Sequence, residues 1–290
     1  MNDLPLVEIF CEGNDKVGYG HIRRSITLAA QLKRDGVGVR IFGLSEEAGW
    51  MLPTPSPASR SAKVQIFDSP CGIDDKIHAA QACGQIAVTL DWFGEAIPDV
   101  NIAVYPHSKV RGIKEVYVGF EYVLIREEIA LLHRTPATHS AKRVIVLLGG
   151  GDLLNQGHET SHWLSEQGFE VTLVQGPLAT NKDTGKGYQV LFNPADMPQL
   201  LAASDWTVTN GGGCLFEAMC MGKAAFVLPQ TEAEMKIAQF AEAKGAVLGV
   251  GLGNLRKFHY SELAIVAESG SNLIDGCGAE RVSAIVRSLM

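Results

Sequence analysis

Short apolar runs alternate along this chain with segments whose apolar residues recur at helical spacing. Runs of strand length occupy residues 6–10 and 37–42. Between them, apolar positions 22, 26, 29 and 32 mark one face of a helix that Gly36 ends. The loop before this helix carries Gly13, Gly18 and Gly20. A strand, a glycine-rich loop, a helix and a second strand form the βαβ unit of a doubly wound sheet, so we predict an α/β fold with parallel strands.

The alternation continues and then starts again in the second half of the chain. Further strands are predicted at 64–68, 85–91, 102–105, 143–148, 171–174, 189–192, 206–209 and 223–229, and helices at 197–203, 232–244 and 279–290. The polar stretch 134–142 separates the halves. We therefore predict two Rossmann-like domains, residues 1–139 and 142–290, facing each other across a cleft of nucleotide-sugar size. The final helix is a candidate to pack back on the first domain.

Composition narrows the class of protein. The 290 residues are 46% hydrophobic and 20% charged, with a net charge of −7. This balance is typical of a globular protein and does not favour a nucleic-acid groove or an anionic membrane surface. The six cysteines form no CxxC pair and are expected to be reduced. With no secretion leader and no apolar run of about 18 residues, we expect a cytoplasmic protein without membrane insertion, monomeric by default.

The segment 209–222, TNGGGCLFEAMCMG, carries the strongest sign of a binding site. It follows the strand predicted at 206–209 and opens a helix. Three consecutive glycines let the backbone approach a ligand closely, and the free N–H groups of the helix's first turn favour a phosphate. Glu217 follows one turn later, where a carboxylate can accept two hydroxyl hydrogen bonds from a ribose. Alternatively, the glycines serve close strand–helix packing, and Glu217 is a favourable acid near a helix start.

Other polar residues have weaker claims. Asp91 follows a predicted strand, where open α/β sheets bind ligands, and it can equally cap a turn. His158 and His162 share a helix face but have no third metal ligand, so we expect no metal site. Asp74 and its neighbour Asp75 are predicted to be solvated in a loop. The first glycine loop lacks the third glycine of the GxGxxG fingerprint, so NAD is not expected.

Two motifs together resemble a known family. The stretch Gly18–Arg24 reads GxGHxxR, and the later turn reads GGGxxxExxxxG. This pairing is similar to the GT-B superfamily, and within it to the UDP-sugar hydrolase of pseudaminic acid biosynthesis and its spore-coat polysaccharide relatives. Further similar stretches follow in order at 90–94, 118–128, 148–152, 196–198 and 274–281. The resemblance covers nearly the whole chain.

The resemblance implies a reaction and a set of site residues. These hydrolases cleave a UDP-linked amino or deoxy sugar at the anomeric carbon with water, without a metal or cofactor, in nonulosonic acid or surface-polysaccharide biosynthesis. His21 would be the general base for water, kept neutral by the helix start. Glu217 would hold the ribose, and the amides of 211–214 the diphosphate. The implied substrate-binding residues are Gly18, Tyr19, Gly20, Arg23, Asp91, Gly149, Gly150, Phe192, Met197, Asn210, Gly211, Gly212, Gly213, Cys214, Glu217, Thr231 and Glu234.

One departure from the family pattern leaves the activity open. The family's hydrolases carry an Asn-Gln pair at the start of the helix predicted at 232–244, and this chain has Ala233 and Glu234 there. An alanine side chain makes no hydrogen bond, and a carboxylate repels a diphosphate. The sugar can therefore differ, with contacts from Gln230, Thr231 or Glu232. Alternatively, the protein is a GT-B glycosyltransferase with a UDP-sugar donor and an unknown acceptor, or a binder that has lost turnover.

Overall fold

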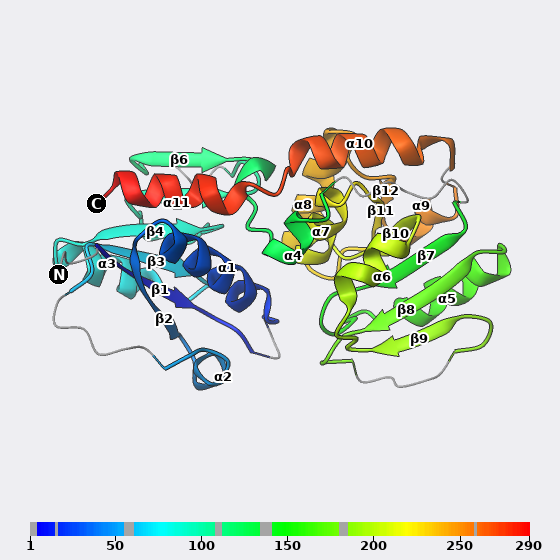
Figure 1. Ribbon diagram of the computed structural model, residues 1–290, viewed down its shortest axis with the longest axis horizontal. Coiled ribbons are helices and arrows are strands. Elements are labelled where there is room, and N and C mark those ends of the chain that lie inside the picture. Colours follow the sequence, from blue (N-terminus) through cyan, green and yellow to red (C-terminus); the bar gives the residue numbers. More distant parts are fainter. Residues whose placement is uncertain are drawn as a thin grey trace. The chain divides into compact units, whose positions relative to one another are not determined.

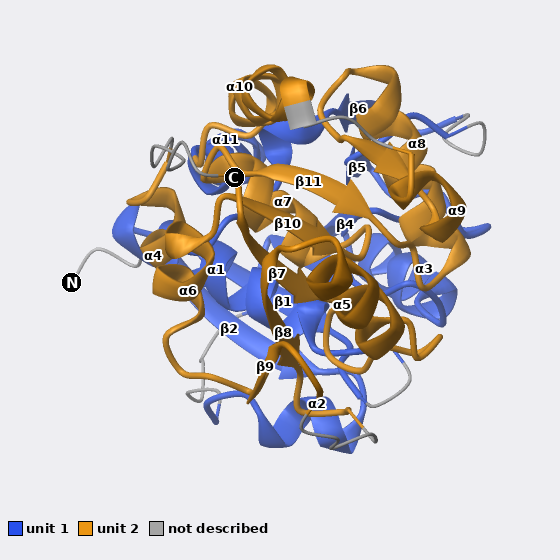
Figure 2. Cartoon of the chain, turned by 90° about the vertical axis from the view of Figure 1, so that its right-hand side faces the viewer, with its two compact units in different colours: residues 1–126, 277–290 blue, residues 127–276 orange. Residues whose placement is uncertain are grey.

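The computed structural model describes residues 5–14, 17–54, 61–107, 112–133, 141–179, 185–257 and 260–290. The chain forms two compact units, residues 1–126 with 277–290, and residues 127–276 (Figure 2). The first unit therefore ends earlier than the predicted boundary, and residues 134–140 of the predicted linker lie outside the described residues. Both units are built from a parallel sheet covered by helices (Figure 1), which confirms the predicted fold class.

The first unit is built on a six-stranded parallel sheet in the order β2-β1-β3-β4-β5-β6. Its strands are β1 (Leu6–Cys11), β2 (Gly38–Gly43), β3 (Val64–Asp68), β4 (Ile86–Leu90), β5 (Val100–Ala103) and β6 (Glu115–Val118). Its helices are α1 (Gly20–Arg34), α2 (Glu46–Trp50), α3 (Asp74–Ala82), the 3₁₀ turn η2 (Phe120–Tyr122) and α11 (Gly278–Ser288). Because β3 pairs with β1, the end of β3 lies beside the loop that leads from β1 into α1.

Apolar periodicity explains how α1 is placed. Its residues Ile22, Leu28 and Leu32 are buried against Val7 and Ile9 of β1 in one core cluster. Val282 and Val286 of α11 belong to the same cluster, so the C-terminal helix belongs to the first unit. Burial of these aliphatic side chains contributes roughly 1.5–3 kcal/mol each. This packing fixes which residues of the first turn of α1 face the end of the sheet.

The second unit has its own six-stranded parallel sheet, in the order β12-β11-β10-β7-β8-β9. Its strands are β7 (Arg143–Leu147), β8 (Glu170–Gln175), β9 (Gln189–Phe192), β10 (Trp206–Thr209), β11 (Ala224–Val227) and β12 (Gly249–Val250). Its helices are α4 (Glu127–Ala130), α5 (Gly157–Glu166), α6 (Met197–Ala203), α7 (Gly213–Cys220), α8 (Glu232–Ala243), α9 (Leu252–Leu255), η3 (Tyr260–Glu262) and α10 (Leu263–Leu273). Every residue of the central strand β10 is buried, as expected for a strand covered on both faces.

Most predicted elements are present with small shifts at their ends. The strands predicted at 64–68, 189–192 and 206–209 and the helix at 197–203 have the predicted bounds. The prediction of a loop at Asp74 and Asp75 is wrong, because both residues open α3, although Asp75 is exposed as expected. Asp74 Oδ1 accepts the backbone N–H groups of Glu95 at 3.2 Å and of Ala96 at 2.7 Å. Within the described residues, no helix is long and apolar enough to cross a membrane.

Candidate functional site

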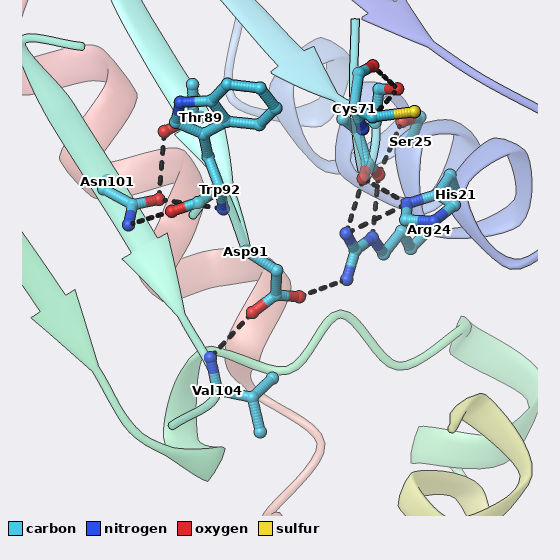
Figure 3. A network of polar contacts seen from close by, with 11 residues as sticks. His21, Arg24, Ser25, Cys71, Thr89, Asp91, Trp92, Asn101 and Val104 are labelled. Atoms are coloured by element: carbon cyan, nitrogen blue, oxygen red, sulfur yellow. Dashed lines mark hydrogen bonds and ion pairs between the residues drawn. The ribbon is translucent and has the colours of Figure 1, made fainter. Parts of the chain in front are cut away.

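A cluster of charged side chains lies at the carboxyl ends of β3 and β4 in the first unit (Figure 3). His21 and Arg24 come from the first turn and a half of α1, Asp68 ends β3, and Asp91 directly follows β4. Parallel strands place their carboxyl ends at one edge of the sheet, which is where open α/β sheets carry their ligands. The sheet order therefore assembles a polar site from three segments that are distant in sequence.

His21 is held by a buried carboxylate. Its Nδ1 lies 2.7 Å from Asp68 Oδ1, and the imidazole remains partly exposed while the Asp68 side chain is fully buried. A deprotonated carboxylate has no proton to give, so the ring donates from Nδ1 and leaves the lone pair on Nε2. This tautomer is the one that a general base requires.

Asp68 accepts hydrogen bonds from several donors. Besides His21, its donors are Arg24 Nε at 2.8 Å, Arg24 Nη2 at 2.5 Å and the Ser25 hydroxyl at 3.2 Å. Burial alone would raise the pKa of Asp68, but the Arg24 guanidinium and the bonds from His21 and Arg24 outweigh it and hold the pKa well below its usual range. The carboxylate therefore stays charged at neutral pH.

Arg24 joins Asp68 to Asp91. Its Nη1 donates to Asp91 Oδ2 at 2.5 Å, while the other carboxylate oxygen of Asp91 accepts the N–H of Val104 at 2.8 Å. Asp91 has a φ of 50°, in the left-handed region that costs a non-glycine residue free energy. The next residue, Trp92, is fixed by the side chain of Asn101, which accepts its N–H at 3.3 Å and donates to its carbonyl at 3.1 Å. Asp91 is therefore held in this conformation by bonds on both sides.

The other residues predicted from the first glycine loop have different environments. Gly18 has a φ of 74°, which favours glycine, and its N–H donates to the Asn14 carbonyl at 2.8 Å. Tyr19 precedes α1 and packs against the core cluster that α1 forms with β1, and Gly20 is the first residue of α1. Arg23, which the sequence put forward as a substrate contact, is exposed, whereas its neighbour Arg24 belongs to the charged cluster.

In the second unit, the glycine turn connects β10 to α7. Gly212 is the N-cap residue of α7, and it makes no side-chain capping hydrogen bond to the helix. Gly213 is exposed, and a Cβ there would meet no atom within 4 Å. Gly211 differs, because a Cβ at that position would lie 2.4 Å from the Glu234 carbonyl oxygen. A Cβ at Gly212 would lie 3.4 Å from both Asn210 Nδ2 and Glu234 Oε1. Close packing therefore explains Gly211, whereas Gly213 has open space beside it.

Glu234 binds this turn. Its Oε1 accepts Asn210 Nδ2 at 2.5 Å and its Oε2 accepts the Gln230 N–H at 2.7 Å. Its own N–H donates to Thr231 Oγ1 at 3.2 Å, so Thr231 caps α8. Burial raises the pKa of Glu234 above its usual range, against the bonds from Gln230, Asn210 and Gly211 that lower it. Glu234 is thus tied to the glycine turn.

The remaining predicted residues lie at the carboxyl end of the second sheet. Gly149 and Gly150 follow β7, and Gly149 has a φ of 73° with the Asn210 side chain beside it. Phe192 ends β9 and is 46% exposed, and Met197 begins α6. Cys214 and Glu217 are half-buried residues of α7. The sheet brings these residues to one edge of the second unit.

The histidine pair of α5 is not arranged as a metal pair. His158 Nδ1 lies 2.7 Å from the Tyr188 hydroxyl, and His158 Nε2 lies 3.0 Å from Gln175 Nε2. His162 instead lies 3.4 Å from Glu166 on the same helix. In the part of the chain that the structure describes, no three His, Cys, Asp or Glu side chains gather as metal ligands.

Two members of the charged cluster were missed by the sequence reasoning. Arg24 is the arginine of the GxGHxxR stretch, and the neighbouring Arg23 was chosen instead. Asp68 ends a strand that was predicted with the correct bounds, and an acid at that position is the same signal that identified Asp91. The information was present in the sequence, but nothing in it said that β3 lies beside β1.

No protein-family model matches the chain. The spore coat polysaccharide biosynthesis protein SpsG of Bacillus subtilis (strain 168) is 25% identical over 215 residues, which cover 66% of this chain and 62% of SpsG. The uncharacterized protein MJ1062 of Methanocaldococcus jannaschii is 22% identical over 273 residues, which cover 78% of this chain and 56% of that protein. The chain spans about six tenths of the length of these curated relatives.

Solved structures resemble the chain over nearly its whole length. MurG of Acinetobacter baumannii has a TM-score of 0.68 at 12% identity, covering 98% of this chain and 99% of MurG. The glycotransferase of kitacinnamycin has a TM-score of 0.67 at 14% identity, covering 99% of both chains. Anabaena Alr3699/HepE, solved in complex with UDP, has a TM-score of 0.57 at 14% identity, covering 98% of this chain and all of HepE. These likenesses, with two six-stranded parallel sheets, show that the chain has the Rossmann-like GT-B fold.

Proposed function

We propose that this protein is a nucleotide-sugar hydrolase that releases UDP and a free sugar from a UDP-linked amino or deoxy sugar. The observation that carries the proposal is the contact of 2.7 Å between His21 Nδ1 and the buried carboxylate of Asp68. It leaves Nε2 as the basic nitrogen of a partly exposed imidazole. The likeness to SpsG and to a fold neighbour solved with UDP supports the substrate class.

The chemistry follows from this tautomer. Water attacks the anomeric carbon, and His21 Nε2 takes the proton that the water loses. The bond between that carbon and the phosphate oxygen breaks, and UDP leaves with the electron pair. Asp68 stabilises the imidazolium that forms, because its carboxylate already accepts the Nδ1 proton. The resemblance assigns no metal or cofactor to these steps.

In the second unit, the glycine turn before α7 would bind the diphosphate of the leaving group. The N–H groups at Gly212, Gly213 and Cys214 begin an uncapped helix and suit a diphosphate. Glu217, one turn further along α7, suits the two hydroxyls of a ribose. Backbone donors in this position stabilise the negative charge that develops on UDP as it leaves.

A glycosyltransferase with a UDP-sugar donor is the alternative function. The observation that favours it is Glu234, which stands where the family's hydrolases have glutamine and which binds Asn210 and Gln230 of this chain. A carboxylate fixed there changes how the sugar or phosphate is contacted, and a different acceptor can accompany that change. In this case an alcohol, and not water, would lose its proton to His21.

The test is release of nucleoside diphosphate from UDP-, CDP-, GDP- and dTDP-sugars without an acceptor, with and without EDTA. We expect release from a UDP-sugar that survives EDTA and is lost in His21→Ala. His162→Ala is the matched control, because His162 is exposed and contacts only its own helix neighbour Glu166 in the described contacts. Binding of UDP that Glu217→Ala abolishes, without release, would refute hydrolysis and favour transfer. Neither release nor binding would overturn both functions.

A further inference from the structure

We propose that Arg24 is a positioning residue that keeps the His21 imidazole neutral, and that Asp91 limits this effect by sharing the guanidinium. The inference rests on the proposed function of His21 as the base. It concerns Arg24 and Asp91, which act on the His21 imidazole and do not touch the substrate. Arg24 contacts both carboxylates of the cluster and also lies 3.1 Å from His21 Nδ1 through Nη2 (Figure 3).

Asp68 by itself would make His21 a poor base. A carboxylate within hydrogen-bond distance favours the charged form of a neighbouring imidazole, and an opposite charge at this range shifts a titration by about one to three pH units. A base that is already protonated at neutral pH cannot accept a proton from water. A positive charge must therefore offset the negative charge of Asp68, while the Asp68 carboxylate stays in place to hold the His21 ring.

The geometry of Arg24 meets this need. Its Nε and Nη2 donate to the two oxygens of Asp68 at 2.8 Å and 2.5 Å, so that the carboxylate is neutralised by a guanidinium that cannot lose its proton. The same Nη2 lies beside His21 Nδ1, so that a positive charge on the ring meets a positive charge on Arg24. A lysine ammonium, as a point charge, cannot bind both oxygens and Asp91 in this way.

Asp91 counteracts Arg24 to a limited extent. It accepts Arg24 Nη1 at 2.5 Å on the side away from Asp68 and adds a second negative charge to the cluster. Its side chain is 22% exposed whereas that of Asp68 is fully buried, so solvent screens Asp91 more strongly. Cys11 of β1 and Glu12 of the loop that follows are further titratable groups near this cluster, because the charges of Asp68, Glu12 and Arg24 all act on the Cys11 thiol. Burial, with the charge of Asp68, raises the pKa of Cys11 to about 12, so this thiol is neutral.

A purely structural role for Arg24 makes a different prediction. As a clamp between α1, β3 and β4, Arg24 would stabilise the fold without setting the charge of His21. Replacing either carboxylate partner of Arg24, Asp68 or Asp91, would then lower activity or stability in the same direction. The electrostatic role instead predicts that substitutions at Arg24 and at Asp91 move the titration of His21 in opposite directions.

The experiment is a titration of the His21 imidazole by ¹⁵N NMR in the full chain, with the pH profile of UDP release measured in parallel. In Arg24→Gln we expect the His21 midpoint and the acid limb of kcat/KM to rise by about one to three pH units. In Arg24→Lys we expect both to return only part of the way, because an ammonium restores the positive charge but not the contacts with both carboxylates. In Asp91→Asn we expect both to fall by about half a unit to one unit. Arg34→Gln, at the exposed far end of α1, is the control and leaves both unchanged.

Asp91→Asn keeps the proposal testable even where Arg24→Gln does not fold, because asparagine tolerates the left-handed conformation and leaves the Asp68–Arg24 pair intact. Midpoints that stay unchanged, or that move in the same direction in both variants, would overturn the inference. The NMR titration needs no substrate, so it separates the two claims. A wild-type protein without UDP release refutes the proposed function, whereas unmoved midpoints in an active protein refute the role of Arg24.

Discussion

Replacing Asp68 by asparagine is the sharpest test of how the first unit holds its charged cluster. Asp68 is fully buried and accepts bonds from His21, Arg24 and Ser25. Asparagine has nearly the same shape, but it presents one amide nitrogen to donors and removes the charge that pairs with Arg24. Breaking a buried ion pair by removing one partner costs about 3–5 kcal/mol. Arg24 retains Asp91, so we expect a loss of about 3 kcal/mol in the free energy of unfolding of this unit.

The effect should depend on pH with a definite sign. The pKa of Asp68 lies below its ordinary value of 3.8 in the folded protein. Such a group contributes stability that is fully present above the unfolded pKa and is lost as the pH falls through the folded pKa. The difference between wild type and Asp68→Asn should therefore be constant above pH about 4 and shrink at lower pH.

The assay is urea unfolding followed by hydrogen exchange of peptides from β1 and β3, which report the first unit by itself. Glu232→Gln is the matched control, because Glu232 forms a helix-surface pair with Lys236 in the second unit and should leave these peptides unchanged. A double-mutant cycle with Arg24→Gln then isolates the Asp68–Arg24 coupling. A loss below about 1 kcal/mol at pH 7, or one that does not shrink in acid, would refute the reasoning.

Three further predictions concern single residues. Glu234→Gln should bind UDP about tenfold more tightly at pH 7, as measured by calorimetry, because the substitution removes a carboxylate beside the proposed diphosphate site. The control Glu232→Gln should bind UDP as wild type does. Unchanged affinity in both variants would place Glu234 away from the phosphate. Gly211→Ala should lower the free energy of unfolding of the second unit by about 1–3 kcal/mol in urea, since its Cβ would lie 2.4 Å from the Glu234 carbonyl, and a neutral result would contradict this packing. Burial and the charge of Asp68 raise the pKa of Cys11 to about 12. Cys11 should therefore resist alkylation at pH 8 while the exposed Cys71 reacts, as measured by peptide mass spectrometry. Equal labelling of the two thiols would contradict the burial of Cys11.

The sequence by itself determined most of the strands, the helix α1 and the two glycine turns. Apolar period identified α1 and the strands β3, β9 and β10, because a buried helix face and a buried strand leave distinct spacings. Glycine runs after a strand identified the turn before α7, because only glycine allows the chain to pass so close to α8 at Gly211. These are local properties of the chain, and local patterns record them.

Tertiary structure alone decided that Arg24 and Asp68 join His21 and Asp91 in the site. Arg23 and Arg24 are adjacent in sequence but about 100° apart around the helix, and the packing of Ile22 and Leu28 against β1 turns Arg24 to the sheet end and Arg23 to solvent. Asp68 joins His21 only because β3 pairs with β1, an order that strand patterns do not encode.

The same holds for the contacts of Glu234. Glu234 binds Asn210, which lies on another strand–helix turn, and the sequence showed only a carboxylate in an unexpected place. For α11, the amphipathic pattern predicted a buried face and the first domain was its candidate partner; in the structure Val282 and Val286 of this helix lie in the core of the first unit. Residue pattern fixes what a segment must bury or bond, whereas the partner depends on chain topology, because non-local contacts are chosen by the packing of the whole unit.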